Sequence, residues 1–156
     1  MKKNRSQRIT HLLIFFFSQF LIFSFSSCEL ETSGNGDIDG FWHLVQIDTL
    51  QTGGVKDTSK DLLFWSFQVN LMELSDQSYQ TPIYMARFNH DNGQLKVTQP
   101  CLYNRYEGNE MLTEENVNVI SQYGINALEE TFQVEGLSGS RMTLSNGTLR
   151  LNFKKM

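Results

Sequence analysis

Few residues of this chain have the types and spacing that chemistry requires. The sequence contains two cysteines, Cys28 and Cys101, and His43 and His90 are the histidines that follow its N-terminal apolar segment. Paired-cysteine zinc spacing, an H-E-x-x-H motif, a G-x-S-x-G nucleophile turn and a G-x-x-x-x-G-K phosphate loop are all absent from the sequence. The spacing of His43, His90 and Cys101 does not require a shared metal site. We therefore expect no metal, no cofactor and no enzymatic activity.

Two pairs of neighbouring glutamates are the other candidates for chemistry. Glu114-Glu115 and Glu129-Glu130 could in principle supply the acid and base of a glycosidase. Side chains adjacent in sequence point in different directions, and each pair stands at the end of a predicted element. We interpret both pairs as solvated charges.

Cys28 follows an N-terminal segment with three parts. Residues 1–11 are basic and polar, residues 12–25 are almost wholly apolar, and the small residues Ser26 and Ser27 precede the cysteine. The apolar part is shorter than the roughly 20 residues of a transmembrane helix. The pattern predicts a signal peptide over residues 1–27. The alternatives are an uncleaved anchor and an ordinary secretory cleavage nearby that leaves Cys28 as a free thiol.

Phe25-Ser26-Ser27-Cys28 resembles the lipobox of bacterial lipoproteins, with Phe25 where leucine is usual. The resemblance implies that Cys28 is lipidated, with acyl chains such as palmitate that hold the protein at a membrane. Glu29 is not the aspartate that resembles an inner-membrane retention signal. We expect a lipid-anchored protein of the cell envelope at the outer membrane, on its periplasmic or surface face. Cys101 would then be the lone cysteine of the domain, and we expect it to be buried.

Charge excludes one class of partner. The chain has 13 Lys+Arg and 17 Asp+Glu, a net charge of −4. Once the four basic residues of the signal segment are removed, nine remain against 17 acidic ones, a net charge of −8. Binding to nucleic acid needs clustered basic residues, so we expect no nucleic-acid partner.

The remaining chain divides into a short linker and one domain. Residues 28–38 are polar and contain glycine, which predicts a flexible tether. From residue 39 to 156 apolar residues recur at every second position, as in half-buried strands. Predicted strands cover 41–47, 63–71, 83–89, 94–98, 132–135, 142–145 and 149–154, with Asn92-Gly93 and Asn146-Gly147 as hairpin turns. Residues 51–60 are predicted as a loop, and residues 114–123 as a helix that ends at Gly124.

These elements predict a mainly β fold. Short turns favour antiparallel pairing, and closing the sheet would leave no exposed edge. We predict a small antiparallel β-barrel of about eight strands with one short helix, and a β-sandwich as the alternative. Trp65 is one of five alternating apolar positions, Leu63 to Leu71, and is predicted to belong to the core.

Two patterns resemble a known family. Gly40-Phe41-Trp42 is similar to the G-x-W signature of lipocalins, and the strand pattern from Tyr123 to Lys155 resembles lipocalin-like domains of uncharacterised Bacteroidetes lipoproteins. The resemblance implies a lipocalin-like barrel that Gly40 and Trp42 close at one end. It also implies an arginine stacked on Trp42, for which we expect Arg150, or failing that Arg141.

Two functions follow as hypotheses. In the first, the barrel binds a small apolar or glycan ligand. In the second, a solid-cored barrel is a structural module that binds another envelope protein. The volume left inside by Trp65, Phe67, Phe132 and Phe153 discriminates between them. Tyr103, Arg105 and Tyr106, in a polar stretch, are the expected exposed contacts with a ligand or partner.

Overall fold

The computed structural model describes residues 33–156, so the predicted signal peptide, Cys28 and the first part of the predicted tether lie outside the described residues. In this part of the chain no helix is long and apolar enough to span a membrane. The elements are η1 (Gly36–Ile38), β1 (Gly40–Thr49), β2 (Gly54–Asp57), β3 (Leu63–Gln68), β4 (Leu71–Asp76), β5 (Tyr84–Asp91), β6 (Gln94–Leu102), β7 (Glu110–Met111), η2 (Val117–Tyr123), β8 (Glu129–Leu137), β9 (Arg141–Ser145) and β10 (Leu149–Lys155). Both η elements are 3-10 helices.

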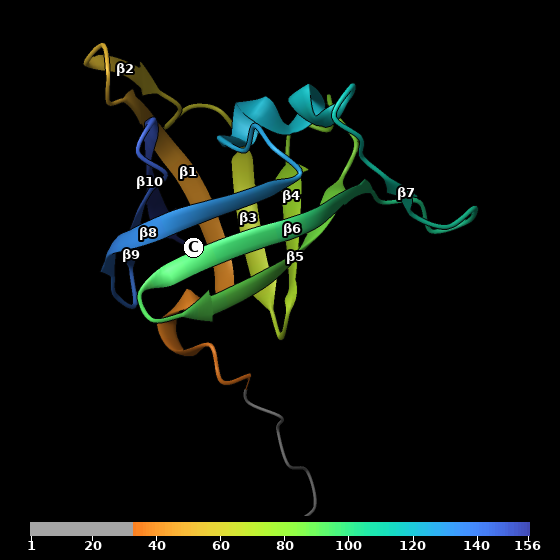
Figure 1. Ribbon diagram of the computed structural model, residues 1–156, viewed down its shortest axis with the longest axis horizontal. Coiled ribbons are helices and arrows are strands. Elements are labelled where there is room, and N and C mark those ends of the chain that lie inside the picture. The colour runs from red at the N-terminus through yellow and green to blue at the C-terminus, as the bar shows by residue number, and fades with distance from the viewer. Residues whose placement is uncertain (1–32) are drawn as a thin grey trace, which may run out of the picture. The chain divides into compact units, whose positions relative to one another are not determined.

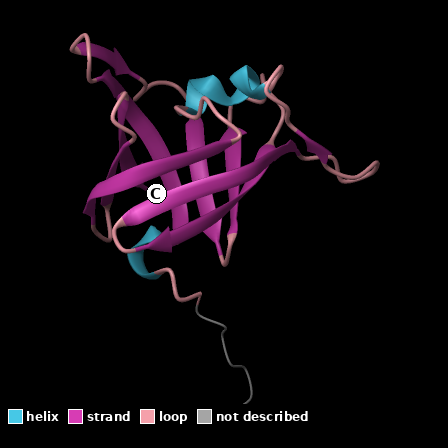
Figure 2. Cartoon of the chain, in the orientation of Figure 1, coloured by secondary structure: helices cyan, strands magenta, loops and turns pink. Residues whose placement is uncertain are grey.

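The strands form a closed antiparallel barrel (Figures 1 and 2). Hydrogen-bonded neighbours follow the order β1-β3-β4-β5-β6-β8-β9-β10, and β10 pairs again with β1. The barrel therefore has eight strands, while β2 and β7 are short additions on β1 and β6. The prediction of a barrel is confirmed, and the alternative of a β-sandwich is wrong.

The barrel has two dissimilar ends (Figure 1). At the end we call the N-terminal pole lie η1 and the turns β3–β4, β5–β6 and β8–β9. At the end we call the η2 pole lie η2, β2, the β4–β5 loop and the hairpin that joins β6 to β7. Alternation along the strands directs the apolar side chains between the poles into one core.

Trp65 lies at the centre of this core and is fully buried, as predicted. Its ring centroid is 6.0 Å from that of Phe67, 5.8 Å from that of Phe132 and 5.1 Å from that of Phe153. Tilted and edge-on contacts of this kind are the ones that aromatic rings prefer. Trp65 Nε1 donates to the backbone oxygen of Tyr123 at 3.2 Å, which satisfies its polar atom without water.

The predicted strand 63–71 is two strands. A tight turn at Val69-Asn70 separates β3 from β4, with Gln68 paired to Leu71. Val69 has φ +58° and is 56% exposed, so the predicted burial of this position is wrong. Positive φ is costly for a β-branched residue, and Asn70 is the one turn residue at this position, inside a run of alternating apolar residues. The segment predicted as a loop, 51–60, also contains a strand, β2.

A β-bulge changes the phase of β1. Leu44 pairs with Phe153 and Gln46 with Asn152, so Val45 is an extra residue in the ladder. Trp42, Leu44 and Ile47 are therefore the buried side chains, although strict alternation placed Ile47 on the face opposite Trp42.

The predicted helix is shorter and tighter than expected. It covers Val117–Tyr123 rather than 114–123, because the Asn116 side chain accepts from Thr113 N at 2.7 Å and holds the preceding residues in a turn. Gly124 ends the helix in the left-handed conformation as predicted. Asn92 and Gly93 also have the positive φ angles expected of their hairpin.

Candidate functional site

Trp42 seals the N-terminal pole. Its indole is fully buried, and Nε1 donates to the carbonyl oxygen of Ile38 at 2.7 Å. Lys155 Nζ lies 4.9 Å from the centroid of the Trp42 ring and donates to Asp37 O at 2.9 Å. Gly40 has φ +116°, and a Cβ there would lie 2.8 Å from Lys155 Cε. A glycine at this position therefore leaves room for the Lys155 side chain to pack against the backbone of β1.

The predicted stacking of an arginine on Trp42 is wrong. Arg150 pairs with Asp48, near the opposite end of β1, and its Nε donates to Glu135 Oε2 at 2.6 Å. This hydrogen bond, and then the charge of Arg150, lower the pKa of the Glu135 carboxyl. Arg141 pairs with Lys154 on β10. Lys155 lies opposite Trp42 and supplies the cation instead.

Part of the predicted tether belongs to the barrel. Ile38 is fully buried, and Asn35 Nδ2 donates to the carbonyl oxygen of Val69 at 2.6 Å. The ordered domain therefore begins before residue 39, because the residues around η1 cover the N-terminal pole.

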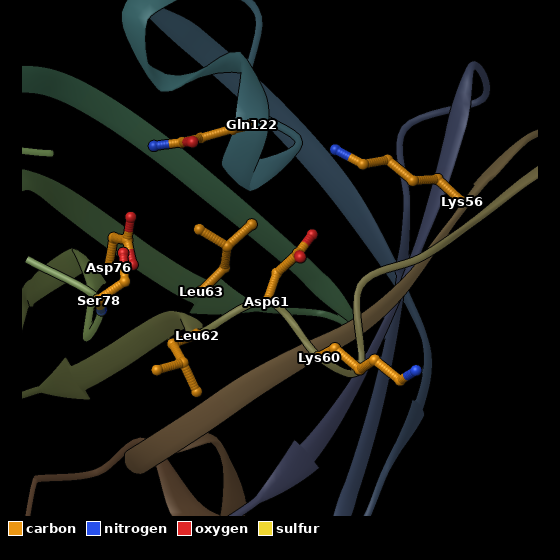
Figure 3. Close-up of a pocket in the computed structure, with 8 residues that line it drawn as sticks. All are labelled: Lys56, Lys60, Asp61, Leu62, Leu63, Asp76, Ser78 and Gln122. Carbon is orange, nitrogen blue, oxygen red and sulfur yellow. Dashed lines mark hydrogen bonds between the residues drawn. The ribbon is translucent and has the colours of Figure 1, made fainter. Parts of the chain in front are cut away.

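At the η2 pole a pocket of about 370 Å³ opens between strands (Figure 3). It forms where β2 and β3 separate: β1 pairs with β3 through residues 40–43 and with β2 through residues 46–49. Thr58 holds the segment between them, because its Oγ1 donates to Leu44 O at 2.7 Å and its N to Val45 O at 3.0 Å. The lining residues are Lys56, Lys60, Asp61, Leu62, Leu63, Asp76, Ser78 and Gln122.

The two carboxylates of the pocket lie on either side of Leu63. Leu63 pairs with Asp76 across the strands, so their side chains lie on the same face. Asp61 lies two residues before Leu63, in a bend between β2 and β3 where its N donates to Thr58 O at 2.9 Å. Figure 3 shows Asp76 on one side of Leu63 and Asp61 on the other. Ser78 N donates to Asp76 Oδ1 at 2.8 Å and fixes that side chain.

The two lysines of the pocket differ in direction. In Figure 3 the Lys56 chain reaches toward the space below Gln122, whereas the Lys60 ammonium points away from the other lining side chains. Hydrogen bonds from Ser59, with a smaller contribution from the charge of Lys60, lower the pKa of Asp57. Because the Lys60 ammonium points away, Lys56 is the lysine whose ammonium is available to the pocket.

Helix η2 forms the roof. Gln122 Nε2 and the Tyr123 hydroxyl lie 3.4 and 3.3 Å from Thr81 Oγ1, which ties η2 to the β4–β5 loop. Tyr123 is buried below the roof, and this burial raises the pKa of its hydroxyl. Gln122 therefore lines the pocket with an amide whose nitrogen already donates to Thr81.

The predicted contact residues Tyr103, Arg105 and Tyr106 lie elsewhere at the η2 pole, on the β6–β7 hairpin. Tyr103 is 42% exposed and Tyr106 is 94% exposed. Asn104 Oδ1 accepts from the backbone N of Tyr106 at 3.0 Å and of Glu107 at 3.1 Å, so the hairpin tip is ordered by its own hydrogen bonds. In Figure 1 this hairpin projects from the barrel.

The histidines and Cys101 do not form a cluster. His43 stacks on Phe64, and its Nε2 lies 2.7 Å from the Asp61 carbonyl oxygen, while His90 stands next to the β5–β6 turn. Cys101 is buried as predicted, and desolvation raises the pKa of its thiol. Within residues 33–156 no three His, Cys, Asp or Glu side chains are grouped so that they could hold a metal ion.

Comparison with known proteins identifies the family. The sequence profile of the lipocalin-like domain matches residues 21–156. The chain belongs to the lipocalin-like domain family. This lipocalin-like protein matches no curated protein.

Solved structures agree with that assignment. A lipocalin-like protein from Bacteroides uniformis ATCC 8492 is 20% identical with a TM-score of 0.59, over 78% of this chain and 100% of that one. An uncharacterized protein from Bacteroides eggerthii DSM 20697 is 20% identical with a TM-score of 0.56, over 76% and 99% of the two chains. A protein from Burkholderia xenovorans is 14% identical with a TM-score of 0.51, over 76% and 83%. At these identities the likeness concerns the fold alone.

Sequence reasoning missed the pocket of this lipocalin-like protein. Its side chains come from β2, β3, the β4–β5 loop and η2, which the barrel brings together. One signal was present: Asp61 stands two residues before Leu63, the first residue of the predicted strand 63–71. Recognising Asp76 as their neighbour requires the β3–β4 register, and the undetected turn at Val69 hid that register.

Proposed function

We propose that this lipocalin-like protein is a non-enzymatic, lipid-anchored envelope protein that binds a small hydrogen-bonding ligand, a glycan fragment, in the pocket at the η2 pole. The observation that carries the proposal is the contrast between that pocket and the barrel interior. The pocket offers charged and amide groups at the barrel mouth, whereas Trp65 and its aromatic neighbours occupy the interior. An apolar ligand inside the barrel would have to displace these rings.

Several features favour a glycan over an apolar ligand. The volume of about 370 Å³ falls in the range of small-molecule pockets. Carboxylate, ammonium and amide groups donate to and accept from hydroxyls, while Leu62 and Leu63 add an apolar surface. An apolar ligand would leave these polar groups without water or partners, which costs free energy.

The position of the pocket suits a protein anchored at Cys28. The chain enters the barrel at the N-terminal pole, and Asn35 is the seventh residue after Cys28, a reach of about 25 Å at most. A barrel tethered at that pole presents its opposite pole, with the pocket, away from the membrane surface.

Amide chemical shifts in the presence of soluble mono- and disaccharides, and separately of palmitic acid, test the ligand proposal. We expect saccharide-induced shifts that gather at Asp61, Asp76 and Gln122, and Ser78→Trp, which fills the pocket, should abolish them. Ser138→Trp in the β8–β9 turn at the other pole is the matched control. Shifts at Trp65 and Phe132 with palmitic acid, and none with saccharides, would establish an interior apolar site instead.

Metabolic labelling with a palmitate analogue tests the anchor. Cys28→Ala should remove both the label and detergent partitioning, because this thiol is the acylation site that the lipobox resemblance implies. Equal labelling of Cys28→Ala and the unmodified protein would contradict lipidation at this residue.

The β6–β7 hairpin favours a second candidate function, the binding of another envelope protein. An ordered loop that exposes 94% of a tyrosine is typical of a protein contact, because little entropy is lost when it docks. In-cell crosslinking from position 106 should then give one discrete product that Asn104→Ala, which loosens the loop, diminishes. A diffuse set of products that Asn104→Ala leaves unchanged would argue against this candidate.

A further inference from the structure

We propose that the pocket at the η2 pole selects a zwitterionic amino sugar, one that carries a free ammonium and a carboxylate. The inference rests on the proposed function, that this pocket binds a glycan fragment, and it adds the charge of the ligand. It is carried by the separation of two opposite charges, Asp76 and Lys56, across one pocket.

The ammonium of the ligand fits the side of the pocket at Asp76, where β4 ends. Asp76 lies on one side of Leu63, and Asp61, in the bend between β2 and β3, lies on the other side (Figure 3). In residues 33–156, neither carboxylate has a basic side chain within ion-pair distance. The second carboxylate oxygen of Asp76 makes no hydrogen bond among these residues, since Ser78 N uses Oδ1. An ammonium donates three hydrogen bonds and can satisfy such acceptors.

The carboxylate of the ligand fits the opposite side. Lys56 stands on β2, across the pocket from Asp76, and within the described chain its ammonium makes no ion pair. Lys60 points away, so one lysine faces the pocket and one ligand carboxylate would neutralise it. Ser78, beside Asp76, and Gln122, from η2, add neutral donors and acceptors suited to sugar hydroxyls (Figure 3).

The arrangement discriminates against other charge types. A neutral sugar would gain the hydrogen bonds but neither ion pair. A purely cationic sugar leaves Lys56 unpaired, and a purely anionic sugar leaves the carboxylates of Asp61 and Asp76 unpaired. Because the pocket is open to water, each ion pair is solvated and contributes modestly, so selectivity comes from satisfying both sides at once.

Four sugars form a complete test on the full-length protein. Muramic acid carries both charges, N-acetylmuramic acid only the carboxylate, glucosamine only the ammonium, and N-acetylglucosamine neither. We expect muramic acid to bind most tightly, with a loss of about two- to fivefold in affinity for each charge removed. The advantage should shrink as sodium chloride is raised, since added salt screens exposed charges.

Two variants assign each charge to its side. Asp76→Asn keeps the acceptor for Ser78 N and should abolish the advantage of the free ammonium, so that muramic and N-acetylmuramic acid bind equally. Lys56→Met should abolish the advantage of the carboxylate. Lys154→Met, an exposed lysine near the C-terminal end of β10, is the matched control and should leave all four affinities unchanged.

The outcomes separate the two proposals. Equal binding of the four sugars at the pocket would leave the proposed function standing and overturn the zwitterion inference, as would a preference that neither variant alters. Absence of binding by all four sugars would overturn both. The comparison of the four sugars on the unmodified protein decides the inference even if a variant fails to fold.

Discussion

At the scale of single residues, the closure of the N-terminal pole depends on a lysine with two simultaneous contacts. Lys155 Nζ lies over the Trp42 ring and also donates to Asp37 O, so the C-terminal strand and the segment around η1 are joined through one side chain. The family resemblance indicated a cation at this place but assigned it to Arg150. The register of β10 against β1 decides the matter, because residue 155 lies opposite Trp42 and residue 150 opposite Asp48.

A double-mutant cycle measures this contact. Trp42→Leu with Lys155→Met should show a coupling of about 0.5–2 kcal/mol in the free energy of unfolding, the range of a cation–π pair. The cycle of Trp42→Leu with Arg150→Met is the control and should show none, since Arg150 is paired with Glu135. Coupling to Arg150 and none to Lys155 would refute the assignment. Urea denaturation followed by far-UV circular dichroism provides the measurement.

Tyr123 makes stability depend on alkaline pH. Burial raises the pKa of its hydroxyl above the ordinary value of 10.0, so the folded state holds the proton more tightly than the unfolded state. Its contribution is then fully present below pH 10 and is lost as the pH rises above that value. Tyr123→Phe should flatten the decline of Tm above pH 10, and Tyr106→Phe, at a 94% exposed position, should leave it unchanged. Identical declines in the unmodified protein and Tyr123→Phe would exclude this residue as the cause.

At the scale of elements, the end of η2 is fitted to the barrel through Gly124. This residue has φ +85°, and a Cβ there would lie 2.5 Å from Leu151 Cδ2, so the roof packs directly on β10. Gly147 has nearly the same φ, +83°, but open space around it. The two glycines therefore differ in packing and share their backbone conformation.

Alanine at each glycine separates these effects. Gly147→Ala should cost about 1–2 kcal/mol from the left-handed backbone alone. Gly124→Ala should cost that amount and about 1–3 kcal/mol more, because the core near Leu151 must be overpacked. Equal losses in the free energy of unfolding would mean that Leu151 moves aside freely.

Elements were predictable from sequence where local signals agree with the pairing. Alternation identified most strands, and Asn92-Gly93 and Gly124 identified a turn and a helix end, because these residues favour positive φ. Alternation failed at Val69, where an apolar residue occupies a turn, and at Val45, where a bulge inserts one residue. The pocket could not be predicted for the same reason, since its residues meet only through the β3–β4 register and the position of η2.

At the scale of the whole molecule, the two poles carry different tasks. The N-terminal pole is closed by buried Ile38 and Trp42, and the η2 pole holds the pocket and the projecting hairpin. Between them the aromatic core around Trp65 is a packed support. Stability and binding should therefore be separable by position along the barrel axis.

Ile38 tests this separation. It belongs to the segment expected from sequence to be a tether, yet it is fully buried and its carbonyl oxygen accepts from Trp42 Nε1. Ile38→Ala should lower the free energy of unfolding by about 2–5 kcal/mol, the cost of a cavity under a large apolar side chain. It should also raise the quenching of tryptophan fluorescence by iodide. Leu50→Ala, at a 36% exposed position by the other pole, should change stability by about 0.5 kcal/mol or less. A stable Ile38→Ala protein with unchanged quenching would show that η1 is an appendage, and that the barrel closes without it.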